Sequence, residues 1–221
     1  MGDYWRIPNK RSGSSTWEMD EVMGWYLNPY NKLIPLICIS ERPVQLLLSI
    51  RNDTDADDPD SGNQGSVIAA DDERTLFMFI EPLTGWCKAA AKENHSKKTY
   101  AELLLEVRKE FSGCEKVRLV SSTLANRGAP AFYEVYQDEP ETAERLHRFY
   151  EFLATPAKSS WLNMAECELI RMCGECLGGM QDPTLAELNE RFAAWTEERR
   201  KLKGIKWQFE IANLISRLYP D

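Results

Sequence analysis

The order in which short apolar runs and amphipathic stretches follow one another constrains the fold of this chain most. Several apolar runs come early and close together, and later runs alternate with stretches whose apolar residues recur at helical spacing. The predicted strands lie at 34–40, 44–50, 74–82, 85–92, 116–122 and 148–154. We expect one α/β domain over residues 1–221, with a mixed central sheet, helices on both faces and a helical C-terminal part at 160–221.

Helix boundaries are marked by capping residues. Residues 14–28 predict a leading helix, and a short helix is expected at 129–136. Thr99 with Glu102, and Thr184 with Glu187, have the spacing of capping boxes, in which a hydroxyl and a carboxylate bond to free backbone N–H groups at a helix start. Both pairs therefore predict the first turn of a helix.

The chain is acidic. It has 35 Asp and Glu against 27 Lys and Arg, a formal net charge of −8. Residues 51–66, RNDTDADDPDSGNQGS, combine acid charge with turn formers and no periodicity, so we expect an exposed acidic loop that interrupts the sheet. This charge argues against broad electrostatic binding to nucleic acid as the main activity.

Composition also restricts location and metal content. No stretch approaches the ~20 apolar residues of a membrane helix, and the N-terminus lacks the apolar core of a secretory signal. Six scattered cysteines have the pattern of reduced thiols. Cys173 and Cys176 form a lone C-x-x-C without a second pair, so helical spacing explains them better than zinc. We expect a cytoplasmic protein with no membrane partner.

Five segments spread along the chain match a known family in order and spacing. They are WRIP, NPYNKLIPLICISERPVQLL, LFMFIEPLTGW, TPAKSSWLNMAECEL and KWQFEIANLISRLYP. Together they resemble the catalytic domain of mariner-like DDE transposases, in the bacterial insertion-sequence branch, from about Trp5 to Pro220. The resemblance implies an RNase H-like fold. We expect the family's N-terminal helix-turn-helix modules, which read DNA sequence, to be absent.

The resemblance also implies a site and shows how this chain departs from it. Such enzymes cut and join DNA with two Mg²⁺ ions held by three carboxylates. The first aspartate of the family falls on Ser40 and the second on Ser122, whereas the third acid is kept as Glu166. A neutral hydroxyl is a poor substitute for a carboxylate beside Mg²⁺. We therefore expect no metal, and water or a cation such as Arg127 or Lys158 beside Glu166.

Neighbouring acids are not expected to replace the missing ones. Glu41 follows Ser40 directly, and successive strand residues point to opposite faces. Glu168 lies about 200° around the helix from Glu166. Glu166 itself has a plainer interpretation, as a carboxylate in the first turn of a helix, where the dipole favours it.

Three functions remain open. The chain is a non-catalytic, transposase-derived module that binds an unknown protein or, weakly, DNA; or an active DDE transposase or endonuclease that uses Mg²⁺; or a decayed fragment. A homodimer is left open. The cluster at 198–206 is either a solvated helix end or a strip for DNA phosphates. The residues of that strip would be Arg199, Arg200, Lys201, Lys203 and Lys206.

Overall fold

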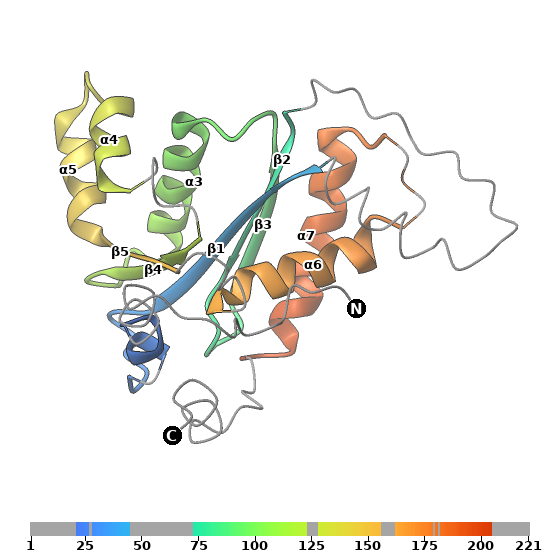
Figure 1. Cartoon of the computed structure of the whole chain (residues 1–221), viewed down its shortest axis with the longest axis horizontal. Coiled ribbons are helices and arrows are strands. Elements are labelled where there is room, and N and C mark those ends of the chain that lie inside the picture. The colour runs from blue at the N-terminus through green and yellow to red at the C-terminus, as the bar shows by residue number, and fades with distance from the viewer. Residues whose placement is uncertain are drawn as a thin grey trace, which may run out of the picture.

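A five-stranded mixed sheet forms the centre of the described part of the chain (Figure 1). The structure, a computed structural model, describes residues 21–26, 28–44, 73–122, 128–155, 162–178, 180 and 182–204. The strands are β1 (Leu36–Pro43), β2 (Thr75–Ile80), β3 (Cys87–Lys92), β4 (Val117–Ser121) and β5 (Tyr150–Ala154). The prediction of an α/β domain with a mixed sheet is confirmed for these residues.

The strand order is β3-β2-β1-β4-β5, so β1 lies at the centre. β1, β2 and β3 form an antiparallel meander, whereas β4 is parallel to β1 and β5 is parallel to β4. Parallel neighbours need a crossover connection, and helices precede both β4 and β5.

Helices cover both faces of the sheet. They are α3 (Lys97–Glu110), α4 (Ala129–Val135), α5 (Pro140–Phe149), α6 (Met164–Cys176) and α7 (Leu185–Lys201). Figure 1 shows α3, α4 and α5 on one side and α6 and α7 on the other. Cys38 and Met78 belong to the core under α6 and α7, and Ile39 and Phe77 belong to the core under α3. Even-numbered residues of β1 therefore face α6.

The bounds of β1 differ from those of the predicted strands. The prediction ended a strand at Ser40 and began another at Val44, but β1 continues through Ser40 and Glu41 to Pro43. Ser40 is in register with Met78 and Pro43 with Thr75, so pairing with β2 carries the strand past the polar residues. Pro43 is tolerated because it is the last residue of the strand. The rest of the strand predicted at 44–50 lies outside the described residues.

Two helices differ from the prediction. α3 is capped by Ser96, whose side chain accepts a hydrogen bond from the Thr99 backbone N–H, so Thr99 lies inside the helix instead of capping it. α5 was not predicted at all. Residues 21–26 are helical, while the rest of the predicted helix at 14–28 lies outside the described residues. The same is true of the acidic loop at 51–66 and of residues 205–221.

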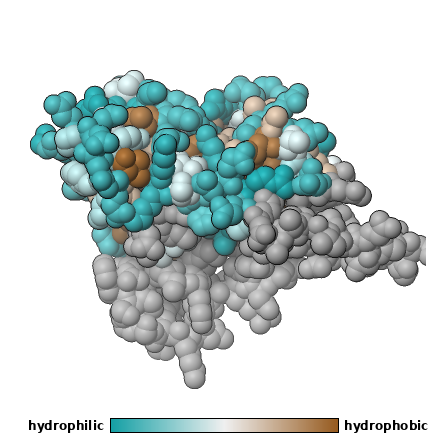
Figure 2. All heavy atoms as spheres, turned by 90° about the horizontal axis from the view of Figure 1, so that it is seen from above, coloured by the Kyte–Doolittle hydropathy of each residue, from teal (hydrophilic) through white to brown (hydrophobic). Residues whose placement is uncertain are grey.

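The described surface is mainly polar. Figure 2 shows one face of the molecule, covered largely by hydrophilic residues with small, separate hydrophobic patches. None of the described helices has the length and apolar character needed to cross a bilayer. This face therefore presents mostly polar and charged side chains to any partner.

The turn between β2 and β3 buries a carboxylate. Glu81 is 3% exposed, and its carboxylate accepts a hydrogen bond from the Thr84 hydroxyl. The Glu81 backbone N–H donates to the Trp86 carbonyl at 2.8 Å and closes the turn. Burial raises the pKa of Glu81, although hydrogen bonds from Thr84 and Tyr30 oppose the shift.

Glu81→Gln should make the protein's stability less dependent on pH. Folding raises the pKa of Glu81. The contribution of this carboxyl group to the free energy of unfolding is therefore fully present below its pKa in the unfolded chain, and it is lost as the pH rises through its pKa in the folded protein. In urea unfolding between about pH 4 and pH 7, the free energy of unfolding of the variant should increase relative to that of the wild type as the pH rises. Glu102→Gln, on the exposed side of α3, is the control. A difference that does not change with pH would contradict the prediction.

Candidate functional site

The candidate site lies where β1, β4 and the start of α6 meet. Asn163 is fully buried at the N-cap of α6, where its side-chain oxygen accepts from the Ala165 backbone N–H at 3.1 Å. Its side-chain nitrogen donates to the Ile39 carbonyl at 2.7 Å. Asn163 thus fixes the first turn of α6 against β1, next to Ser40. Sequence reasoning missed this residue, although an asparagine three positions before Glu166 is an N-cap signal.

Glu166, in this first turn, has hydrogen-bond partners on both carboxylate oxygens. The Ser122 hydroxyl donates to Oε1 at 3.1 Å. Arg42 donates to Oε2 from Nε at 3.1 Å and from Nη2 at 2.8 Å. The Glu166 side chain is 5% exposed, whereas that of Arg42 is 38% exposed. A cation and a hydroxyl therefore hold a nearly buried carboxylate.

Ser40 lies on β1, and Ser122 directly follows the last residue of the neighbouring strand β4. Ile39 of β1 is paired with Ser121 of β4, so Ser40 and Ser122 each follow one member of this pair. Ser40 is 2% exposed, and its hydroxyl has no hydrogen-bond partner among the described residues. The structure thus brings Ser122 into contact with Glu166 and places Ser40 on the strand face toward α6, between Cys38 and Arg42.

Arg42 is the functional residue that sequence reasoning missed. Arg127 and Lys158, the cations expected beside Glu166, lie outside the described residues. Arg42 lies two positions after Ser40 on β1, and strand residues two apart point to the same face. The spacing could be seen in the sequence, but the predicted strand ended at Ser40, so Arg42 was not expected on the same strand.

The donor set of this site does not suit the Mg²⁺ ions that the family resemblance implies. It offers one carboxylate, neutral hydroxyls and a guanidinium that is always protonated. Mg²⁺ is bound through carboxylates and substrate phosphates, and a fixed positive charge repels it. No group of three or more His, Cys, Asp or Glu side chains within the described ranges could hold a metal ion.

The neighbouring acids lie elsewhere, as the sequence predicts. Glu168 forms a two-point ion pair with Arg199 of α7, with both N–O distances at 2.9 Å. The two side chains are 10% and 4% exposed. Glu41 is in register with Phe77, which packs in the core under α3 on the opposite face of the sheet.

The structure describes the basic cluster at 198–206 up to Gly204. Arg199, which the sequence predicts as a DNA contact, is buried against Glu168, and the hydrogen bonds between the two side chains raise the pKa of the guanidinium. Arg200 donates to the Cys87 carbonyl at 2.9 Å and lies near Glu197, and Lys201 pairs with Glu198. Lys203 is exposed, and Lys206 lies outside the described residues. Burial and ion pairing thus engage most of the described cations.

The C-x-x-C pair consists of protonated thiols. Cys173 and Cys176 are both buried on α6. Burial raises the pKa of Cys173 to about 12 and that of Cys176 to about 11. Metal ligation requires the thiolate form, which such environments disfavour at neutral pH.

Comparison with protein-family models finds no match, and comparison with curated proteins finds none either. The site consists of a nearly buried carboxylate that is neutralised by Arg42 and hydrogen-bonded by Ser122, at the end of β4.

Proposed function

We propose that this chain is an RNase H-like domain of the DDE-transposase type that has no catalytic activity and acts as a binding module for a protein or a nucleic acid. The observation that carries the proposal is the Arg42–Glu166 ion pair with Ser122 hydrogen-bonded to the same carboxylate. The single retained acid of the motif is held by a cation from the same chain.

The strand order supports the fold part of the proposal. A meander of three strands followed by two parallel strands, with helices on both faces, is the order that the resemblance implies. The relative places of the three motif positions also support it, because Ser40 lies on β1, Ser122 directly follows the adjacent strand β4, and Glu166 lies in the first turn of α6.

The chemistry of the side chains argues against the active-enzyme alternative. Two-metal cutting and joining of DNA needs carboxylates that bind both ions and stabilise the attacking and leaving oxygens. Ser40 and Ser122 supply only neutral hydroxyls, and Glu166 is neutralised by Arg42. Among the described residues, no further carboxylate joins Glu166 in a group that could hold a metal ion.

The local consistency of the chain argues against a decayed fragment. The Thr184–Glu187 capping box is complete, the Asn163 cap is bonded at both ends, and the buried pair of Glu168 and Arg199 is well formed. Such agreement between local signals and the fold is expected of a sequence under selection.

Recovery of the tagged protein from its native cell, analysed for protein and nucleic acid together, tests the binding role. We expect the same cytoplasmic partner in every repeat. The folded chain should recover this partner and the unfolded chain should not. Repeated recovery with no enriched partner would favour the decayed fragment instead.

Binding to DNA should be weak, indifferent to sequence and steeply dependent on salt. The net charge is −8, and the exposed cations of the basic cluster that remain are few. Fluorescence anisotropy with a labelled duplex should show affinity falling with salt, and Lys203→Glu should lower it further. Tight, salt-resistant binding to one sequence would contradict the prediction. Reversing the charge of Arg199 is unsuitable here, because it would unpair the buried Glu168.

A further inference from the structure

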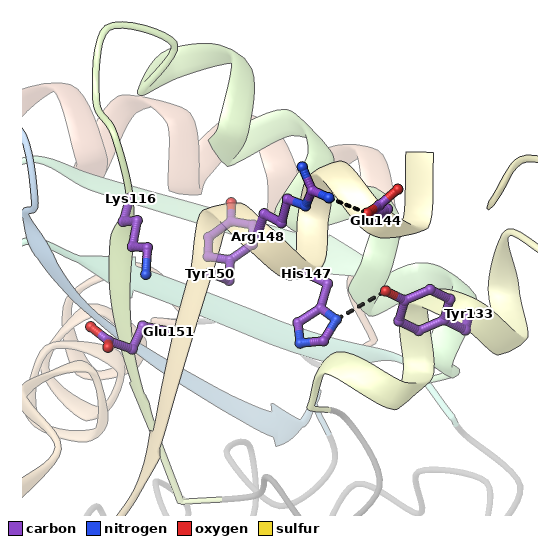
Figure 3. Close-up of a pocket in the computed structure, with 7 residues that line it drawn as sticks. All are labelled: Lys116, Tyr133, Glu144, His147, Arg148, Tyr150 and Glu151. Atoms are coloured by element: carbon purple, nitrogen blue, oxygen red, sulfur yellow. Dashed lines mark hydrogen bonds and ion pairs between the residues drawn. The ribbon is translucent and has the colours of Figure 1, made fainter. Parts of the chain in front are cut away.

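A hollow of about 690 Å³ lies at the other end of β4 from Ser122 (Figure 3). Lys116, directly before β4, and Tyr150 and Glu151, at the start of β5, line it from the sheet. The remaining lining residues come from α4 and α5. Lys116 and Ser122 flank a strand of five residues, so the hollow is roughly 20 Å from the candidate site. Its volume is in the range of small-molecule sites.

The charges around the hollow leave one cation without a partner. Glu144 pairs with Arg148 on α5, and Glu151 pairs with Arg118 at 3.0 Å. Lys116 has no ion pair within the described part of the chain. Both carboxylates are therefore paired with arginines, Glu151 with one from outside the lining, and the ammonium group of Lys116 is left as the unpaired positive charge of the hollow.

His147 adds a hydrogen-bond donor. Its Nδ1 lies 3.0 Å from the Tyr133 hydroxyl, and the two rings are perpendicular with centroids 5.7 Å apart. When the phenol donates to Nδ1, the neutral imidazole carries its proton on Nε2. Figure 3 shows the His147 ring projecting from α5 with Nε2 turned away from Tyr133. Arg148, the next residue, lies in the last turn of α5, where a cationic side chain offsets the helix dipole.

Aromatic side chains form the remaining wall. Tyr150 is 4% exposed, and its hydroxyl donates to the Leu104 carbonyl at 2.7 Å, so the phenol is fixed in place. Burial raises the pKa of Tyr150 well above its usual value, so this phenol stays neutral. Tyr133 is 44% exposed and offers a flat face for stacking.

We propose that this hollow binds a nucleoside monophosphate, in which a ribose joins a phosphate group to a flat base. Lys116 supplies the charge and His147 a hydrogen bond, while Tyr133 stacks on the ring. A lysine ammonium group binds phosphate as a point charge and does not need the flat two-point geometry of an arginine fork. The site does not depend on Ser40, Ser122 or Glu166. The same phosphate chemistry could come from the end of a nucleic-acid strand.

Isothermal titration of the full chain with adenosine 5′-monophosphate tests the proposal. We expect saturable binding that weakens about tenfold or more for adenosine, which lacks the phosphate, and similarly in Lys116→Gln. His147→Phe should also weaken binding. Lys98→Gln on α3, whose lysine is 76% exposed, is the matched control and should bind like the wild type. Lys116 is exposed, so an unchanged unfolding midpoint would show that its variant keeps the fold.

A second arm identifies the source of the phosphate. It compares single-stranded oligonucleotides with and without a 5′-phosphate. If the phosphorylated strand binds, the unphosphorylated strand does not, and Lys116→Gln abolishes this binding, the phosphate site is supported. If the mononucleotide also fails to bind, the site is assigned to the ends of nucleic-acid strands. Absence of binding by every probe, or binding that is equal in Lys116→Gln and Lys98→Gln, would overturn the proposal.

Discussion

Replacing Arg199 with alanine should lower the free energy of unfolding by about 3–5 kcal/mol. Arg199 forms two hydrogen bonds to the Glu168 carboxylate and one from Nη1 to the Lys203 carbonyl, all at 2.9 Å. Its removal would leave Glu168 buried without a counter-charge, and an unpaired buried charge is costly. Urea unfolding monitored by circular dichroism measures the loss.

A matched control for this prediction lies on the same helix. Lys201 pairs with Glu198, and both side chains are well exposed, so Lys201→Ala should cost less than about 1 kcal/mol. Replacing Arg199 and Glu168 together with methionine should recover most of the loss, because no charge is then left unpaired. An effect of Arg199→Ala no larger than that of Lys201→Ala would refute the account of this pair.

Replacing Arg42 with alanine should lower the free energy of unfolding by about 1–3 kcal/mol, because Ser122 would then be the remaining hydrogen-bond partner of Glu166 within the described part of the chain. The loss should be smaller than for Arg199, since Arg42 is 38% exposed. Glu166→Gln should then be better tolerated in the Arg42→Ala background than in the wild type. A double-mutant cycle should give a coupling energy of about 1 kcal/mol or more.

Arg148 on α5 provides the comparison for Arg42. It pairs with Glu144 one helical turn away, with both side chains exposed, so a cycle on that pair should give under about 0.5 kcal/mol. If the effects of Arg42→Ala and Glu166→Gln were simply additive, the ion pair would not be what holds the Glu166 carboxylate.

Local sequence patterns correctly predicted structural features that depend on residues close to one another in the chain. The Thr184–Glu187 capping box is present, with the Thr184 hydroxyl accepting from the Glu187 backbone N–H. Leu188 and Phe192, which are four residues apart and so share one face of that helix, are fully buried. Helix geometry alone predicted that Glu168 and Glu166 would point to different sides of their helix.

Features that depend on distant contacts were not predictable in the same way. Arg42 and Glu166 are 124 positions apart, so their pairing needs the whole sheet and α6 to be in place. The length of β1 depends on its partner β2. α5 was missed because its many charged residues obscured a stripe of small and apolar buried residues. That stripe consists of Thr142, Ala143, Leu146 and Phe149.

The most direct measurement of the central claim is a DNA nicking and joining assay with the purified chain in Mg²⁺ or Mn²⁺. The wild type should give neither product, because Ser40 and Ser122 supply no carboxylate and Arg42 neutralises Glu166. Glu166→Ala should be indistinguishable from it. Metal-dependent turnover by the wild type that disappears in Glu166→Ala would contradict the account and establish an active DDE enzyme with unusual ligands.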